Sequence, residues 1–390
     1  MSAMNGSSRR TRRGLLGCCM ALALVLSAIV FAPVSAQAES EPATTTYLAL
    51  GDSISFGYTA ERFANHKAAE SPSFFEEGVA NDFTKDLKKP SEIGKGIRLV
   101  NDACPGETSN GLIGENPEVG GKESTESYEE IEGMPKEQFP AGGYQGLGDY
   151  HPCAYTFHTH LPLHNGGYVQ GGKEISQLEE AVSTVKGTNS PVKAITLNIG
   201  SNDELAAIKQ CEDEVAVEFG TTGKSKYGPS PSVAVITCIT QTSENVTVPH
   251  IINNLVTIIK VIDESGYTGP IVLLGFYNPD TFILPGSDAL QAGTNAAVEA
   301  NVVKNFPNVT FANPFPVFNA GSSSLPGKAS APKEKKAICK YTEMCNAHDI
   351  EVNNKAQEEK GETPRNEGDI HPTPKGYKLL AKLLYKALGH

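Results

Sequence analysis

The stretch YLALGDSISFGY, residues 47–58, begins as an apolar run and breaks at Gly51-Asp52-Ser53. A short apolar run that ends at a glycine is typical of a buried β-strand leading into a tight turn. A serine at this point is either a nucleophile displayed at the carboxyl end of a strand or a polar residue of an ordinary loop. Gly-Asp-Ser alone does not separate these interpretations, and the decision between them depends on the rest of the chain.

Four more apolar runs of strand length follow, bounded by Gly, Pro, Asn or Asp and with little alternation of polar and apolar residues. Strands buried on both faces of a parallel sheet have this pattern. Together with the first run, the predicted strands are 46–51, 97–103, 192–200, 270–277 and 309–315. Segments with a helical period lie between or after them, at 71–87, 176–186, 248–265, 286–306 and 373–388. This order predicts an α/β fold with helices on both faces of a parallel sheet.

The first 38 residues have the composition of an export signal. A basic segment with four arginines precedes an apolar run from Leu15 to Phe31, and the small residues Ala36-Gln37-Ala38 follow. The apolar run is short and wrongly flanked for a permanent membrane span, and a lipid anchor at Cys18 is rejected because the run follows that cysteine. We expect cleavage of residues 1–38, by the Sec or the twin-arginine route of a bacterium, and a single secreted domain at 39–390.

The charge of the chain excludes two classes of partner. Removing the signal, which contains four arginines and no acidic residue, takes the net charge from −12 to −16. Such an acidic protein repels nucleic acid and anionic membrane surfaces. Residues 115–150, rich in Glu and Gly without an apolar period, are predicted to form an acidic loop insertion.

Six cysteines remain after cleavage, and an even number in an exported protein indicates disulfides. Six cysteines allow fifteen connectivities, of which we favour the pairing of sequence neighbours because no Cys-x-x-Cys metal spacing competes. The predicted pairs are Cys104–Cys153, Cys211–Cys238 and Cys339–Cys345. Three histidines at 158, 160 and 164 lie near Cys153 without a carboxylate beside them, so no metal site and no cofactor are predicted.

Four polar motifs lie where predicted strands end or where the last helix begins. In open α/β sheets, active sites form beyond the carboxyl ends of the strands. The first strand ends in GDS with Ser53, the second leads into NDACPGETS with Gly106, and the third ends in GSND with Asn202. EGDIHPTPKGY, with His371, precedes the last helix. Ser, Gly, Asn and His thus come in this order from separate element ends.

This order of motifs resembles the SGNH, or GDSL-type, hydrolases over the whole mature chain, and the style of YLALGDS, CPGET, SQL, LNIGSND and HPTPKGY is similar to secreted actinobacterial lipases and esterases. The resemblance implies a flavodoxin-like three-layer α/β/α sandwich with a five-stranded parallel sheet. It also implies roles for the residues: Ser53 attacks an ester carbonyl, and His371 is the base. The N–H groups of Ser53 and Gly106 and the Asn202 amide form the oxyanion hole.

One position departs from the family pattern, which has an acid three residues before the histidine. That position is Gly368 here, and the nearest acids are Asp369 and Glu367. Either the Asp369 carboxylate or a backbone carbonyl can hold the imidazole in the required tautomer. We assign Asp369 as the third catalytic member and leave the carbonyl as the alternative.

The sequence therefore predicts a secreted serine esterase or lipase that acts as a monomer on small-molecule or lipid esters. The polysaccharide O-acetyl esterases share this fold and are the enzymatic alternative. A non-catalytic secreted binding protein is the alternative of another class, although a binding protein has no need of all four motifs. No Gly-x-Ser-x-Gly motif occurs, which argues against an α/β-hydrolase lipase.

Overall fold

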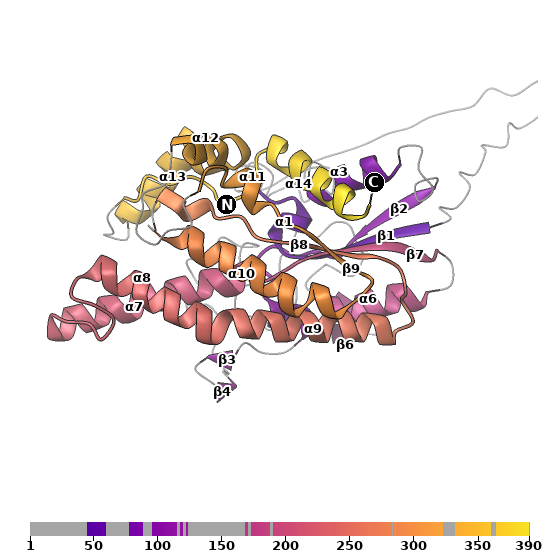
Figure 1. Ribbon diagram of the computed structural model, residues 1–390, viewed down its shortest axis with the longest axis horizontal. Coiled ribbons are helices and arrows are strands. Elements are labelled where there is room, and N and C mark those ends of the chain that lie inside the picture. Colours follow the sequence, from indigo (N-terminus) through magenta and orange to yellow (C-terminus); the bar gives the residue numbers. More distant parts are fainter. Residues whose placement is uncertain are drawn as a thin grey trace, which may run out of the picture. The chain divides into compact units, whose positions relative to one another are not determined.

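A computed structural model of the chain describes residues 45–59, 78–88, 96–114, 118–119, 122–123, 168–170, 173–187, 190–282, 284, 286–322, 332–359 and 364–389. Its central sheet has five parallel strands in the order β2-β1-β7-β8-β9 (Figure 1). The strands are β1 (Thr45–Gly51), β2 (Ile97–Asn101), β7 (Val192–Asn198), β8 (Ile271–Leu274) and β9 (Val309–Ala312). All five predicted strands are confirmed, and each ends at or before its predicted last residue.

Among these five strands the order is 2-1-3-4-5, that of a flavodoxin-like doubly wound sheet. In this topology the chain turns to opposite sides after the first and third strands, and the crevice between their carboxyl ends is the usual ligand site. Here these strands are β1 and β7, which pair from Thr46 opposite Val192 to Gly51 opposite Asn198. The GDS and GSND motifs therefore follow the two strands that flank the switch point.

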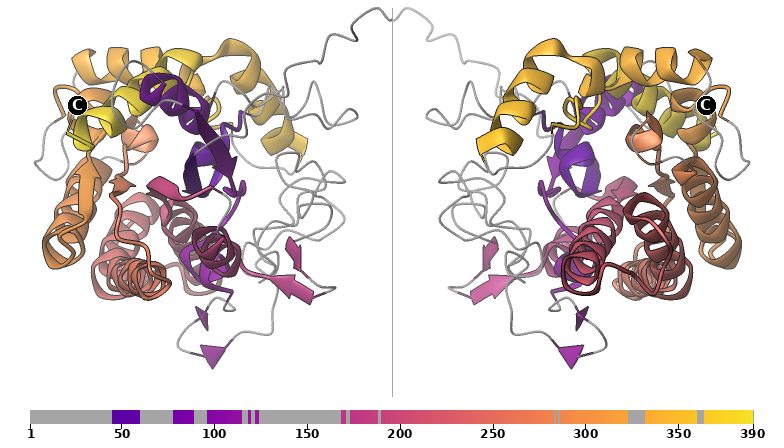
Figure 2. Two further views of the ribbon diagram at one scale, coloured as in Figure 1. Left: turned by 90° about the vertical axis from the view of Figure 1, so that its right-hand side faces the viewer. Right: turned by 90° about the vertical axis from the view of Figure 1, so that its left-hand side faces the viewer.

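Helices cover both faces of the sheet, as predicted (Figures 1 and 2). Tyr47 and Ala49 of β1 pack toward α3 (Val79–Leu87) and α14 (Pro374–Ala387). Leu48 and Leu50, which alternate with them, belong to the apolar cluster on the other face. That face is covered by α4 (Ser109–Ile113), α6 (Gln177–Lys186), α9 (Val248–Glu264) and α10 (Ser287–Asn301). The three-layer α/β/α arrangement follows from this alternation, because each strand presents side chains to both layers.

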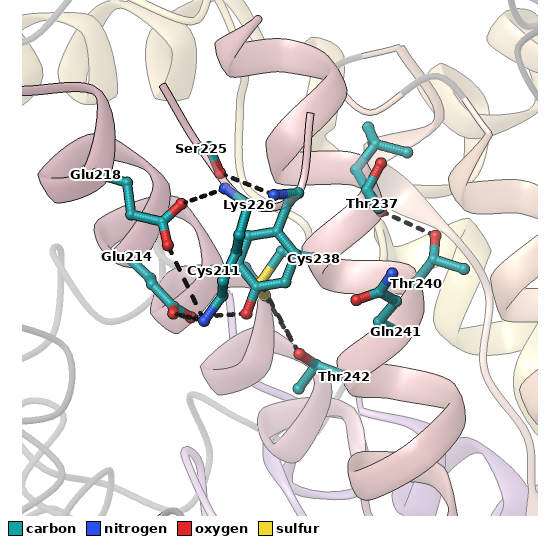
Figure 3. The surroundings of a disulfide bond; sticks show 12 residues. Cys211, Glu214, Glu218, Ser225, Lys226, Thr237, Cys238, Thr240, Gln241 and Thr242 are labelled. Atoms are coloured by element: carbon teal, nitrogen blue, oxygen red, sulfur yellow. Dashed lines mark hydrogen bonds and ion pairs between the residues drawn. A yellow bond between two sulfur atoms is a disulfide. The ribbon is translucent and has the colours of Figure 1, made fainter. Parts of the chain in front are cut away.

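A long helical hairpin, which the sequence analysis did not predict, follows β7. It consists of α7 (Ser201–Thr222) and α8 (Pro231–Thr242), joined by the disulfide Cys211–Cys238 (Figure 3). Lys226 in the connecting turn lies 2.6 Å from a Glu214 oxygen. Because α7 begins just after the carboxyl end of β7, the hairpin starts at this edge of the sheet. Asn202 lies in the first turn of α7.

The helix α8 continues through the π-helical segment η3 (Ser243–Thr247) into α9. This stretch, Pro231–Glu264, is long and apolar enough to span a membrane by length and composition, with a mean hydropathy of 1.2 over an 18-residue window. Its α9 part packs Ile251, Leu255 and Ile258 into the core beside the sheet. Burial against the sheet accounts for the apolar composition of α9.

Three further helical elements precede the last helix. They are α12 (Pro332–Tyr341), the 3-10 turn η6 (Glu343–Cys345) and α13 (Ala347–Glu359), and the disulfide Cys339–Cys345 joins the first two. Neither α12 nor α13 was predicted from the sequence pattern. The turn η6, which lies between α12 and α13, contacts the loop that leads to His371.

Two of the three predicted disulfides are thus present in the structure. Cys104 is disulfide-bonded as well, but its predicted partner Cys153 lies outside the described residues. The predicted signal at 1–38 and the three histidines near Cys153 also lie outside them. Of the predicted insertion at 115–150, the structure describes only the paired short strands β3 (Glu118–Val119) and β4 (Lys122–Glu123).

Candidate active site

The turn after β1 presents Ser53 at the start of the short helix α1 (Ser53–Phe56). Asp52 caps this helix, since its carboxylate accepts a hydrogen bond from the Ile54 N–H at 2.9 Å. A side chain at position 51 would meet the Asn198 carbonyl oxygen of β7, so this close passage requires Gly51. The Gly-Asp-Ser order is thus explained locally: glycine for the close passage, aspartate for the cap, and serine at the first helical position.

Ser53 and His371, which are 318 positions apart in the sequence, are in hydrogen-bond contact. The Nε2 atom of His371 lies 2.9 Å from the Ser53 hydroxyl oxygen. On the other side of the ring, Nδ1 lies 2.5 Å from an Asp369 carboxylate oxygen. Asp369 and His371 are both more than nine-tenths buried. The arrangement of hydroxyl, imidazole and carboxylate is that of a serine-hydrolase triad.

The loop before α14 is wound so that an acid two positions before the histidine reaches the ring. The Asp369 oxygen that contacts Nδ1 also accepts a hydrogen bond from the His371 backbone N–H at 3.1 Å. This is an Asx-turn, in which an aspartate bonds the backbone two residues further on. Of the two orienting groups that the sequence left open, the structure has the Asp369 carboxylate in contact with the imidazole.

The turn η6 supports this loop. The Gly368 N–H donates to the Met344 carbonyl, and the Glu343 N–H donates to the His371 carbonyl, both at 2.9 Å. A Cβ at position 368 would lie 2.2 Å from the Glu343 carbonyl oxygen. Position 368, where the family pattern has its acid, therefore has no room for a side chain.

Two tyrosines fix the histidine further. The ring of Tyr58 meets that of His371 edge to face, with centroids 4.7 Å apart. The Tyr277 hydroxyl, three residues after β8, donates to the Ile370 carbonyl at 2.8 Å. The imidazole is therefore held by a ring contact on one side and by a bonded backbone next to it. Neither tyrosine was assigned to this role from the sequence, which gave no signal for contacts between such distant segments.

The loop after β2 carries Gly106 beside the turn with Ser53. Its position follows from the backbone bond between the Cys104 N–H and the Gly51 carbonyl, at 2.9 Å. Gly106 has a φ of 81°. The Asn202 amide donates to the Glu107 carbonyl at 2.8 Å, so the start of α7 is attached to the same loop. Within the described residues, no hydrogen bond uses the backbone N–H of Ser53 or Gly106.

Asp203, the next residue after Asn202, attaches the loop that carries Gly106 to α7 a second time. The Asp203 carboxylate accepts hydrogen bonds from the Ser109 N–H at 2.9 Å and from its hydroxyl at 2.5 Å. Asn254 of α9 donates to the same hydroxyl at 2.8 Å. The loop 106–109 is therefore fixed against both α7 and α9, which gives Gly106 and Asn202 a common rigid support.

Burial changes the ionisation of the acids around the site. Burial raises the pKa of Asp52 from 3.8 to about 7, although the bond from Ile54 and the charge of His371 oppose the change. Burial also raises the pKa of Glu107 well above its ordinary value, as it raises that of Asp203. Within the described residues, no cluster of three or more His, Cys, Asp or Glu side chains is placed to hold a metal ion.

No protein-family model and no curated protein matches the sequence. Among solved structures, an extracellular lipase from Streptomyces rimosus covers 88% of this chain and 99% of its own, with 14% identity and a TM-score of 0.41. A lipolytic G-D-S-L family member from Veillonella parvula covers 89% and 99%, with 12% identity and a TM-score of 0.38. A carbohydrate esterase family 2 enzyme from Corynascus thermopiles covers 89% and 66%, with 13% identity and a TM-score of 0.39. All three structures are less than 15% identical to this chain.

Proposed function

We propose that this protein is an exported serine hydrolase of carboxylic esters. The observation that carries the proposal is the contact of His371 with two partners, the Ser53 hydroxyl through Nε2 and the Asp369 carboxylate through Nδ1. A serine hydroxyl is a weak nucleophile until a base takes its proton, and imidazole titrates in the range where it can do so. A carboxylate on the other ring nitrogen holds the required tautomer and stabilises the imidazolium.

In the proposed reaction, Ser53 Oγ attacks the ester carbonyl carbon while its proton moves to Nε2 of His371. The tetrahedral intermediate collapses, the alcohol leaves with that proton, and the acyl group stays on Ser53. Water, deprotonated by His371, then attacks the acyl carbon, and the second tetrahedral intermediate collapses as His371 returns the proton to Ser53 Oγ and the acid is released. The reaction balances without a cofactor.

The negative oxygen of each tetrahedral intermediate needs donors that are already in place. We assign this role to the backbone N–H groups of Ser53 and Gly106 and to the Asn202 amide. The attachment of Asn202 to the Glu107 carbonyl and of Asp203 to Ser109 supports the assignment, because a rigid donor stabilises the transition state without reorganisation.

The proposed substrates are acyl or lipid esters, and the proposed enzyme is a secreted monomer. The disulfides Cys211–Cys238 and Cys339–Cys345 support an oxidising, extracellular compartment. Hydrolysis of p-nitrophenyl esters of increasing acyl length, measured beside acetate release from acetylated xylan, tests the substrate class. Activity rising with acyl length supports a lipase or esterase, and activity on xylan alone supports the polysaccharide O-acetyl esterase. The absence of turnover on every ester would leave a binding protein and contradict the proposal.

A further inference from the structure

A fully buried glutamine at the start of α6 binds the backbone of the turn with the nucleophile. The Gln177 side-chain oxygen accepts a hydrogen bond from the Gly51 N–H at 2.5 Å. Its amide nitrogen donates to the Gly51 carbonyl at 3.1 Å. Gly51 lies two residues before Ser53. Both of its backbone polar groups are thus bonded by one side chain, that of Gln177, which is 126 positions away in the sequence.

Gly51 is the last residue of β1, where the chain leaves the sheet. The next N–H, that of Asp52, donates to the Asn198 carbonyl of β7 at 3.0 Å. The Gly51 carbonyl also accepts from the Cys104 N–H of the loop after β2, at 2.9 Å. The amide of Gln177 therefore bonds the backbone at the position where strand pairing ends. These bonds restrict the path of the chain from β1 to Ser53.

The same amide reaches the loop that carries Gly106. Burial raises the pKa of the Glu107 carboxyl group well above its ordinary value, and the nearby Gln177 amide acts in the opposite direction by lowering it. The Glu107 backbone carbonyl accepts from Asn202. The Gly51 carbonyl, which accepts from Gln177, also accepts from Cys104 of this loop, and Asn202 donates to the loop at Glu107. These bonds join the three segments to which the oxyanion donors are assigned.

We propose that Gln177 is a positioning residue that fixes the turn with Ser53 relative to the Gly106 loop. The inference rests on the proposed ester hydrolysis and deepens it. Gln177 touches neither the substrate nor the reacting atoms in this account, and acts through the Gly51 backbone and Glu107. Its amide is suited to the task because it offers an acceptor and a donor side by side, as a neighbouring strand would.

Replacement by methionine removes the bonds and keeps a similar length. Gln177→Met should lower kcat on a p-nitrophenyl ester by about 10- to 100-fold, because small displacements of a nucleophile cost this much. KM should stay within about twofold, since ground-state binding is not changed. The rate is divided by the number of sites that react with a fluorophosphonate, so that unfolded protein does not count.

Replacement by glutamate gives a second, independent readout. A protonated carboxyl group offers one donor and one acceptor, as the amide does, whereas a carboxylate offers acceptors only. The ratio of kcat for Gln177→Glu to that of the wild type should therefore rise toward one as the pH falls from about 9 to about 5.5. Asp52 and Asp203, which act on the neighbouring Glu107, are present in both proteins. The new carboxyl group titrates together with Glu107, so the ratio reports the ionisation of this pair.

Gln291 of α10 supplies the matched control, because its amide donates to Glu204 and not to the backbone of the turn. Gln291→Met should keep kcat per labelled site at the wild-type value. The inference is overturned if Gln177→Met has wild-type kcat per labelled site, even with a lower melting temperature, or if the Gln177→Glu ratio does not depend on pH. If Gln177→Met does not fold, the pH series decides alone. A wild-type protein without esterase activity would instead refute the proposed function.

Discussion

His371 Nδ1 lies 2.5 Å from an oxygen of Asp369, two residues earlier, and the same oxygen accepts the His371 backbone N–H. One carboxylate oxygen thus fixes both the ring and its backbone. The spacing differs from the Asp-x-x-His pattern of the resembling family, and the space around Gly368 gives the reason. The loop is pressed against Glu343, and an acid at 368 would have no room.

The first prediction concerns this unusual acid. Asp369→Asn should reduce kcat at least 100-fold, because the carboxylate both holds the tautomer and stabilises the imidazolium; in full triads its loss costs up to about 10⁴-fold. Glu367→Gln is the control and should change kcat little. Steady-state rates on one p-nitrophenyl ester measure both. Activity of Asp369→Asn within about threefold of the wild type would mean that Ser53 and His371 act as a dyad.

The second prediction concerns Asn202, the proposed oxyanion donor. Asn202→Ala should lower kcat by about 10²- to 10³-fold with little change in KM, since the donor acts in the transition state. The Asn202 bond to Glu107 also supports the loop, so the melting temperature is measured in parallel. A change confined to KM would show that Asn202 binds the substrate instead.

The third prediction concerns the disulfides. Peptide mapping without reduction should find Cys104–Cys153 in addition to the two pairs in the structure, and free thiols at these six cysteines would contradict this prediction. Because Cys339–Cys345 closes on η6, which bonds the His371 loop, replacing both cysteines by alanine should lower kcat about tenfold.

The double alanine variant of Cys211 and Cys238 is the matched control for that effect. It opens a longer loop, with a sequence separation of 27, and should cost about 3 kcal/mol of unfolding free energy while kcat of the folded protein changes less. Equal losses of kcat in the two double variants would refute a specific role of η6.

The fourth prediction concerns Asp52, whose pKa burial raises from 3.8 to about 7. An acid that binds its proton more tightly in the folded state stabilises the fold less as the pH rises from about 4 to about 7. Asp52→Asn keeps the cap acceptor and cannot ionise, so its unfolding free energy relative to wild type should increase over this interval by a few kcal/mol. Urea unfolding at several pH values measures the difference, and a constant difference would contradict the raised pKa.

The sequence predicted the sheet well because its strands are buried on both faces and so read as continuous apolar runs. The run ending at Gly51, and the serine after it, could be placed because strand ends and active sites coincide in this topology. Gln177 could not be found in this way. Its segment, SQL, carries part of the family resemblance and begins a capped helix, but neither signal assigns a role to Gln177, which depends on a contact with Gly51 that tertiary folding creates.

The hairpin of α7 and α8 was also missed, although it contains one predicted disulfide. Its few buried residues, among them Val215, Ala234 and Cys238, form a small cluster of their own, so no apolar stripe of the usual width marks it. For the acid, the sequence left two candidates open because local spacing does not specify how a loop is wound. The backbone of η6 decides this, and η6 is a separate element.

The proposed mechanism requires that Ser53, activated by His371, is the nucleophile. The most direct test is fluorophosphonate labelling of the wild type and of Ser53→Ala, with the adduct located by peptide mass spectrometry and esterase activity followed in the same samples. We expect one adduct per chain, on Ser53, with loss of activity in proportion to labelling. Ser53→Ala should be unlabelled and inactive with a nearly unchanged melting temperature. An adduct on another serine, or full activity of Ser53→Ala, would contradict the account.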